Sequence, residues 1–171
     1  MKVTLDDLNG RSEEGFVSVC GALFEHSPWI AARTWQRRPF HSVEELHRQL
    51  ISTLAGASEN EKLALINAHP DLVGRLAREG RLTGESAREQ AAAGLDAVTP
   101  AEVELFEQYN TTYRRKFGFP FIICARENRK EAILKAFPKR LTHSREAEVA
   151  AALEEIGRIA RLRLLDAGAE E

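Results

Sequence analysis

The residue whose type and position best suit acid–base chemistry is His69, which is followed by Pro70. The apolar pattern of residues 61–68 indicates a short helix, and a proline disfavours helical geometry at the residue before it, so we expect this helix to end at His69. An imidazole there lies beside carbonyl groups without helical partners, where a positive charge is favoured. Imidazole also changes charge near neutral pH. His69 is therefore a candidate proton donor, and the alternative is that it only caps the helix.

A second candidate group lies on one face of a helix predicted at residues 82–93, which Gly94 ends. Ser86, Glu89 and Gln90 stand at positions i, i+3 and i+4, so they share this face. A hydroxyl, a carboxylate and an amide in one row can form the polar wall of a small-ligand site. Such residues are also common on solvated helix faces, and this is the alternative interpretation.

The apolar run at residues 117–125 is the least helical part of the sequence, because Gly118 and Pro120 interrupt it. An extended segment among helices leaves backbone N–H and C=O groups that need partners. A flat polar ligand with ring amides can supply these partners. The alternative is that side chains or water do so, and that the run simply belongs to the core.

Arg163 is set among apolar residues of a long helix predicted from Ser144 to Asp166. A buried arginine needs partners, and a carboxylate of the site or a planar polar ligand would serve. The alternatives are an internal ion pair, or a side chain that extends its charged end to solvent.

The elements that must position these residues are almost all helices, because apolar residues recur with a period near 3.6 along the chain. Asn9 and Gly10 are expected to form a turn. We therefore predict an all-α protein, a single-domain bundle of about eight helices over residues 1–171, with one extended apolar segment at residues 117–125. The predicted helices cover residues 13–25, 28–36, 42–54, 58–69, 71–79, 82–93, 99–116, 128–138 and 144–166, and the expected caps are Ser12, Ser27, Ser42, Ser58, Thr99, Glu127 or Asn128, and Ser144.

Composition excludes several classes of function. The 171 residues carry a formal net charge of −2 with both signs interspersed, so no nucleic-acid surface is predicted, and no window is apolar enough to span a membrane. Residues 1–7 lack the apolar core of a signal peptide, and residues 167–171 are not a peroxisomal address. Cys20 and Cys124 are expected to be reduced core thiols, which suits a cytoplasmic protein. No Cys/His spacing suggests a zinc site, so no metal ligands are predicted.

Several motifs follow one another along nearly the whole chain. They are His69-Pro70-Asp71-Leu72, then Leu82-Thr83 with Ser86, Glu89 and Gln90, then Ala93-Gly94-Leu95, then Phe117-Gly118-x-Pro120-Phe121-Ile122-Ile123-Cys124-Ala125-Arg126, and finally Ile159-Ala160-x-x-Arg163-Leu164. Residues 24–29 and 38–40 precede them. In this order and spacing they resemble the OHCU decarboxylase family, where OHCU is 2-oxo-4-hydroxy-4-carboxy-5-ureidoimidazoline. One departure is Glu127, where we expect the family to have glycine.

The resemblance implies an all-α, cofactor-free carboxy-lyase that is commonly a homodimer. It implies conversion of OHCU to (S)-allantoin with loss of carbon dioxide, after urate oxidase and hydroxyisourate hydrolase have acted in urate breakdown. It also implies a cytoplasmic, bacterial-type member.

By position, the resemblance makes His69 the catalytic histidine and Pro70 a substrate contact. In our hypothesis His69 delivers a proton as general acid, and Glu89 either fixes the imidazole or hydrogen-bonds the substrate. The electron pair left by the departing carboxylate can delocalise into an adjacent C=N group, so no metal or organic cofactor is required. The other implied substrate contacts are Ser86, Ala87, Arg88, Glu89, Gln90, Phe121, Ile122, Ile123, Cys124, Ala125 and Arg163.

Two rival hypotheses belong to other classes of protein. A small-ligand sensor would use His69 and Arg163 as contacts only, and would bind a urate-derived ring without turnover. An all-α interaction protein would bind no ligand, and Glu89→Ala would then affect only stability. The ordered motifs favour the enzyme over both.

Overall fold

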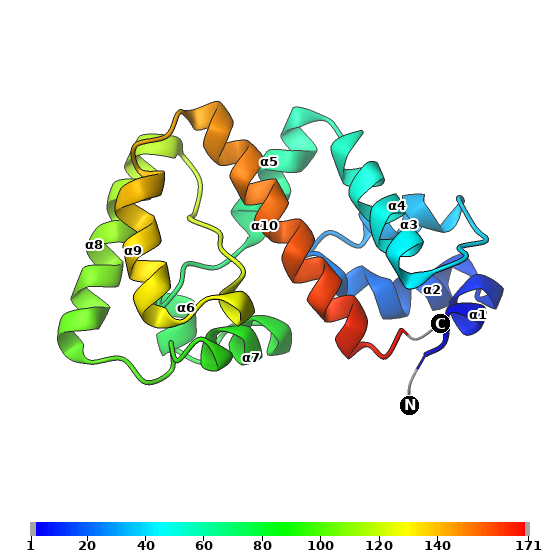
Figure 1. Ribbon diagram of the computed structural model, residues 1–171, viewed down its shortest axis with the longest axis horizontal. Helices are drawn as coiled ribbons and strands as arrows, with labels where there is room; N and C mark the ends of the chain where they lie inside the picture. The colour runs from blue at the N-terminus through cyan, green and yellow to red at the C-terminus, as the bar shows by residue number, and fades with distance from the viewer. Residues whose placement is uncertain (1–2, 170–171) are drawn as a thin grey trace. The chain divides into compact units, whose positions relative to one another are not determined.

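The computed structural model describes residues 3–169, apart from the side chain of Leu76. The terminal residues on which the signal-peptide and peroxisomal expectations partly depend, Met1, Lys2, Glu170 and Glu171, lie outside this range. Within residues 3–169 the regular elements are all helical and no β-strand occurs, so the predicted all-α class is confirmed (Figure 1). The elements are α1 (Leu5–Gly10), α2 (Glu13–Cys20), η1 (Gly21–Leu23), α3 (Trp29–Trp35), α4 (Val43–Ala55), α5 (Glu59–Ala68), α6 (Arg75–Arg78), α7 (Gly84–Ala92), α8 (Pro100–Phe117), η2 (Ala125–Glu127), α9 (Lys130–Arg140) and α10 (Arg145–Asp166), where η marks a 3₁₀ helix.

The chain divides into two compact units. One is formed by the residues up to Leu65 together with those from Gly157 onward, and the other by Ile66–Ile156. In the first unit α3 packs against both α2 and α4. In the second unit α8 and α9 lie side by side, and α7 contacts η2 (Figure 1). The single domain expected over residues 1–171 stays a prediction.

Most predicted helix starts are confirmed by the side chains that cap them. Ser12, Ser42, Ser58 and Ser144 each accept a hydrogen bond from the backbone N–H three residues further on. Thr99 does the same and forms a capping box with the third residue of α8. These bonds satisfy N–H groups that have no partner inside the helix, which is why short polar residues mark helix starts in a sequence.

The turn predicted at Asn9 and Gly10 is wrong, because both residues belong to the last turn of α1. Thr4 begins this helix with a capping box. The Asn9 amide is used in a tertiary contact: its Nδ2 donates to the carbonyl oxygen of Phe40 at 2.8 Å, and its Oδ1 accepts from the N–H of the same residue at 2.9 Å. The two long-range hydrogen bonds to Phe40 therefore outweigh the local preference of these residues for a turn.

The helix predicted at residues 71–79 is also wrong in its first half. Only α6 is helical, and residues 71–74 form a tight turn in which Val73 has a φ of 53°. A helix cannot pass through a residue with positive φ. The turn is held by side chains from α7 and α8, and such distant partners leave no local signal in the sequence.

Two predicted caps serve other purposes. The Oγ of Ser27 donates to the carbonyl oxygen of Glu25 at 2.9 Å, and α3 begins one residue later than predicted. Neither Glu127 nor Asn128 caps α9, since the residue before this helix is Arg129. The Asn128 Nδ2 instead donates to the carbonyl oxygen of Cys124 at 2.9 Å.

Aromatic side chains fix the segment between α8 and α9. Phe119 and Phe121 are buried, and the Phe121 ring stacks on Phe137 of α9 with centroids 3.9 Å apart. Tyr113 of α8 meets both Phe119 and Phe121 edge to face. Gly118, with a φ of 83°, ends α8 in the left-handed conformation that glycine adopts without strain. The predicted extended apolar segment is therefore present and anchored in the core.

Across residues 3–169, none of the helices combines the length and the hydropathy needed to cross a membrane.

Candidate active site

His69 follows α5 directly, where the sequence predicted a helix end. Its backbone N–H donates to the carbonyl oxygen of Ile66 at 3.2 Å, a tighter step than the α-helical one, and Pro70 comes next. Only 7% of His69 is exposed. The imidazole is thus buried, and the backbone on both sides restricts where it can lie.

The polar face predicted on α7 exists. Ser86 and Gln90 are 5% and 6% exposed, and Glu89 is half-buried. Ala87 and Arg88, which were expected as further substrate contacts, are exposed, and the Arg88 guanidinium lies 3.6 Å from the carboxylate of Glu85. The buried side of α7 therefore consists of the residues at positions i and i+4, with the carboxylate of Glu89 at its edge.

Gln90 connects α7 to the turn that follows His69. Its Oε1 accepts from the N–H of Val73 at 3.2 Å, and its Nε2 lies 3.4 Å from the carbonyl oxygen of Asp71. A primary amide has two N–H donors and two acceptor lone pairs, so one of each is left for a ligand. Gln90 thus contacts the backbone of Asp71 and Val73, the first and third residues after Pro70. Helical spacing could not predict this arrangement.

The backbone of the extended segment is partly satisfied by side chains. The carbonyl oxygen of Ile122 accepts from Arg140 Nη1, and the N–H of Cys124 donates to Glu155 Oε2 at 3.0 Å. Ile123 lies between these two residues and is 9% exposed. Among residues 3–169 no hydrogen-bond partner exists for its N–H or its C=O. The side-chain alternative therefore holds for the residues on either side of Ile123 and fails at Ile123 itself.

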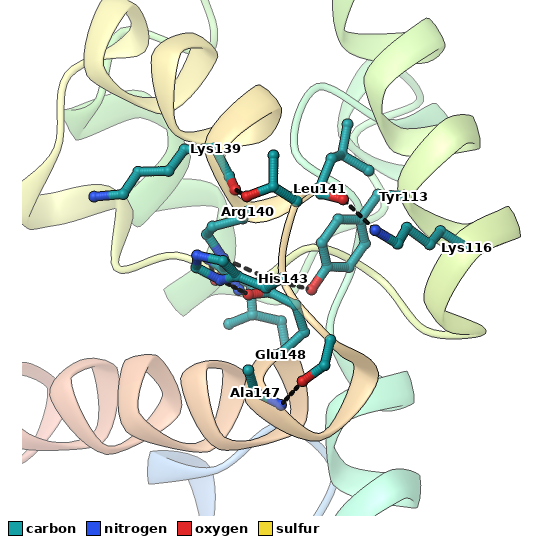
Figure 2. A network of polar contacts seen from close by, with 11 residues as sticks. Tyr113, Lys116, Lys139, Arg140, Leu141, His143, Ala147 and Glu148 are labelled. Atoms are coloured by element: carbon teal, nitrogen blue, oxygen red, sulfur yellow. Dashed lines mark hydrogen bonds and ion pairs between the residues drawn. The ribbon is translucent and has the colours of Figure 1, made fainter.

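A buried polar cluster around Glu148 holds this segment in place. The Glu148 carboxylate is fully buried and accepts from the Tyr113 hydroxyl at 2.5 Å and from Arg140 Nε at 2.8 Å. A 2.9 Å hydrogen bond joins its other oxygen to His143 Nδ1. Figure 2 shows the three partners turned toward Glu148. The Arg140 guanidinium also lies 4.2 Å from the centre of the Phe121 ring, so one side chain holds the segment by its backbone and by a cation–π contact.

Burial raises the pKa of the Cys124 thiol to about 11, and the nearby carboxylate of Glu127 raises it further. At neutral pH the thiol is therefore protonated, and a protonated thiol is a weak nucleophile. The backbone N–H and C=O of Cys124 already bind the side chains of Glu155 and Asn128.

Arg163 is 6% exposed and belongs to the unit formed by the two ends of the chain. Its Nη2 lies 3.1 Å from Glu25 Oε1, and its Nη1 donates to the carbonyl oxygen of Ala22 at 3.2 Å. Glu25 is itself only 3% exposed. Of the alternatives for this arginine, the structure contains the internal ion pair. The other predicted site residues all lie within Ile66–Ile156.

Two residues next to the predicted site were not identified from the sequence. Glu25, which pairs with Arg163, stands between a buried phenylalanine and a histidine, and a carboxylate in an apolar stretch is a signal that could have found it. Asn110, on α8, is 6% exposed and donates to the carbonyl oxygen of Leu72 at 2.9 Å. Its signal is an amide on the otherwise apolar stripe of a helix.

No group of three or more His, Cys, Asp or Glu residues in the described range is arranged to hold a metal ion.

Comparison with known proteins gives the same identification from several directions. The family described as OHCU decarboxylase matches residues 9–165. The 2-oxo-4-hydroxy-4-carboxy-5-ureidoimidazoline decarboxylase of Halalkalicoccus jeotgali is 44% identical over 163 residues, which are 95% of this chain and 90% of the relative. A uric acid degradation bifunctional protein of Bacillus subtilis is 40% identical over 163 residues, 95% of this chain and 32% of that protein.

A solved structure agrees in fold as well as in sequence. The crystal structure of (S)-allantoin synthase superimposes with a TM-score of 0.78 at 30% identity, covering 96% of this chain and 54% of the other. The match of the family includes every residue that the sequence had assigned to the site, from His69 to Arg163. On these grounds the chain belongs to the OHCU decarboxylase family.

Proposed function

We propose that this protein is a carboxy-lyase that converts OHCU to (S)-allantoin and carbon dioxide in urate degradation, with His69 as the proton donor. The observation that carries the proposal is the family match over residues 9–165, which contains a buried histidine at a helix end. The names of the relatives supply the reaction and the pathway, and the stereochemistry follows the name of (S)-allantoin synthase.

In the reaction, the bond between a ring carbon and the carboxylate breaks and carbon dioxide leaves. The electron pair of that bond moves into the adjacent C=N group of the ring, so the substrate itself accommodates the developing charge. A proton must then be added, from one face, to the ring carbon of that former C=N group. The 4-hydroxyl becomes a carbonyl in the same step, and its proton passes to the ring nitrogen that received the electron pair. His69, as an imidazolium general acid, donates the proton that the ring carbon receives, a contribution of about 10²–10⁴-fold to the rate. Delivery from one fixed side sets the (S) configuration.

The residues of α7 form the polar wall around the ring. Glu89 orients the imidazole or accepts a hydrogen bond from the substrate, and its negative charge destabilises the bound carboxylate relative to neutral carbon dioxide. Ser86 forms hydrogen bonds with polar atoms of the ring or the ureido group. The remaining donor and acceptor of Gln90 do the same. Ala87 and Arg88 are the remaining proposed contacts on this helix, and both are exposed.

The segment from Phe121 to Ala125 binds the planar amides of the substrate through its backbone. Ile123 supports this role, because its N–H and C=O lack partners among residues 3–169 and neither is free to bend away from neighbours held by Arg140 and Glu155. A donor and an acceptor on one residue match the N–H and C=O of a cyclic amide. Because the backbone is already ordered, binding costs little side-chain entropy.

Arg163 holds a carbonyl or anionic group of the substrate. The carboxylate of Glu25 and the carbonyl oxygen of Ala22 orient the guanidinium. Pro70 adds an apolar contact beside His69. The active protein is proposed to be a cytoplasmic homodimer, which light scattering would detect as a species of twice 19.1 kDa.

The deciding experiment generates OHCU in situ from urate with urate oxidase and hydroxyisourate hydrolase, adds this protein, and records circular dichroism against time. Rapid loss of the OHCU signal with growth of an (S)-allantoin signal is expected, and it reports decarboxylation and stereochemistry together. Folded protein that leaves the decay at its spontaneous rate would contradict the decarboxylase assignment. Titration with the same ring compounds would then test the rival sensor, which predicts binding without turnover.

A further inference from the structure

The turn at residues 71–74 has a conformation that its sequence does not favour. Val73 has a φ of 53°, in the left-handed region that a β-branched side chain rarely adopts. The turn is also tight at its end, because a Cβ on Gly74 would lie 2.7 Å from the Cβ of Asp71. Backbone strain of this kind persists only where the surroundings enforce it, and it is concentrated at functional sites. Val73 is four residues from His69.

Two residues of α8 enforce this turn. Asn110 Nδ2 donates to the carbonyl oxygen of Leu72 at 2.9 Å, and Arg114 binds the carboxylate of Asp71 with its Nε at 3.0 Å and its Nη2 at 2.9 Å. The two residues are one helical turn apart, so they present adjacent side chains on one face. From α7, Gln90 accepts the N–H of Val73. Three consecutive residues of the turn are thereby each tied to a different side chain.

The buried side chain of Asn110 carries a free-energy cost, and its other contacts do not explain why an asparagine stands at this position. It is 6% exposed, and its Oδ1 has no hydrogen-bond partner among residues 3–169. A buried acceptor without a partner is unfavourable, and an apolar residue of similar size would avoid it. Within the described part of the chain, the side chain of Asn110 makes one hydrogen bond, the one to Leu72.

We propose that Asn110, assisted by Arg114, is a positioning residue for the reaction: it holds the turn after His69 in its strained conformation and so keeps the imidazole in the geometry for proton delivery. The proposal rests on His69 being the proton donor. Only Pro70 and Asp71 separate His69 from the tethered carbonyl of Leu72, and proline has little backbone freedom. A shift of the turn is therefore transmitted to the imidazole.

The test begins with Asn110→Leu, which removes the donor and the unpartnered acceptor together while keeping the number and branching of the heavy atoms. We expect kcat to fall at least 10-fold and KM to change less than about 3-fold, since the residues proposed to bind substrate are untouched. Gln108→Leu, on the exposed face of the same helix, is the matched control and should leave both constants unchanged. A folded Asn110→Leu enzyme with kcat within 2-fold of the parent overturns the proposal.

A second comparison separates positioning from general stability. Glycine adopts a positive φ without strain, so in a Val73→Gly background the turn no longer needs enforcement. The fold-loss caused by Asn110→Leu should therefore be several times smaller in Val73→Gly than in the parent. Equal losses in both backgrounds contradict the proposal.

Two further variants keep the test decisive. If Asn110→Leu does not fold, Arg114→Met takes its place, because this side chain is partly exposed; we expect a smaller loss of kcat with KM unchanged, and an unchanged kcat overturns the proposal. His69→Gln is measured in parallel. Full turnover of His69→Gln refutes the proton donor itself, whereas an inactive His69→Gln with a fully active Asn110→Leu refutes only the positioning role.

Discussion

At the scale of single residues, several charged and polar groups of this protein are removed from water. His69, Glu25 and Arg163 are each less than a tenth exposed, and each is held by the backbone or by a charged partner. Burial strengthens electrostatic interactions because the surrounding dielectric is low, but it also makes an unpaired charge costly. Substitutions at these residues should therefore have large effects, of a kind that depends on which role each residue has.

Replacing His69 tests the chemical step. We expect His69→Gln to lower kcat by about 10²–10⁴-fold, the range for loss of a general acid, with a smaller effect on KM. Steady-state turnover of OHCU generated in situ measures both constants. His41→Gln removes an exposed histidine and should be neutral. Near-normal turnover in His69→Gln would assign the proton to another group.

Replacing Glu25 tests the buried ion pair. Glu25→Ala leaves the Arg163 charge buried without its carboxylate, so we expect the free energy of unfolding in urea to fall by about 3–5 kcal/mol. Glu107→Ala breaks a comparably short pair with Arg78 whose side chains are both about half exposed, and solvent screening limits its cost to about 0–1 kcal/mol. Similar losses in the two variants would mean that burial does not govern this pair.

The two thiols make a prediction about pH. Burial raises the pKa of Cys20 to about 12 and that of Cys124 to about 11, from the usual 9.0. The folded state thus holds these protons more tightly than the unfolded state, so their contribution to stability is complete below pH 9. It is lost progressively as pH rises from 9 to about 11 for Cys124 and to about 12 for Cys20. Cys124→Ala should reduce this alkaline decline in the unfolding free energy.

Iodoacetamide at pH 8 should label both thiols slowly in the folded protein and rapidly in urea, and rapid labelling of the folded protein would contradict their burial.

At the scale of elements, the second unit is held together by one polar cluster as well as by aromatic packing. Glu148 is at the start of α10, and its partners come from α8 and α9 and from the turn after α9. Arg140 extends the same cluster to the carbonyl oxygen of Ile122. These side chains thereby fix the backbone of the extended segment in an all-α protein, in which residues 3–169 offer no strand to pair with it.

Tyr113→Phe tests how much this cluster contributes. The change removes one hydrogen bond to a buried carboxylate and keeps the ring, so we expect a loss of about 1.5–3 kcal/mol in the free energy of unfolding. Tyr109→Phe is the matched control: this ring stacks on Phe137 with centroids 5.1 Å apart, and the variant preserves that contact. Equal stabilities of the two variants would show that the 2.5 Å bond to Glu148 has no net effect.

At the scale of the whole molecule, the sequence predicts features that depend on nearby residues. It misses contacts between residues that are far apart in the chain. Helix starts at Ser42 or Thr99 are visible because the capping residue and the N–H it binds are three residues apart. The extended segment is visible because Gly118 and Pro120 lie within it. The pairing of Arg163 with Glu25 joins residues 138 positions apart in the sequence, and spacing alone carries no information about it.

The candidate site follows the same rule. Ser86 and Gln90 on a buried helix face, and His69 at a helix end, could be predicted from the sequence. The turn at residues 71–74 was predicted as helix, because nothing near Val73 indicates that Asn110 imposes a positive φ on it. Side chains that act by constraining another segment are recognisable only once the chain has folded.

The division of the chain also has a consequence for its synthesis. The first unit needs residues from both ends: His47 Nε2 is 2.9 Å from the carbonyl oxygen of Gly157, and Arg163 reaches Ala22 and Glu25. All of Ile66–Ile156 is translated before those contacts can form. On a nascent chain, the first unit can therefore be completed only after the second half of α10 has been synthesised.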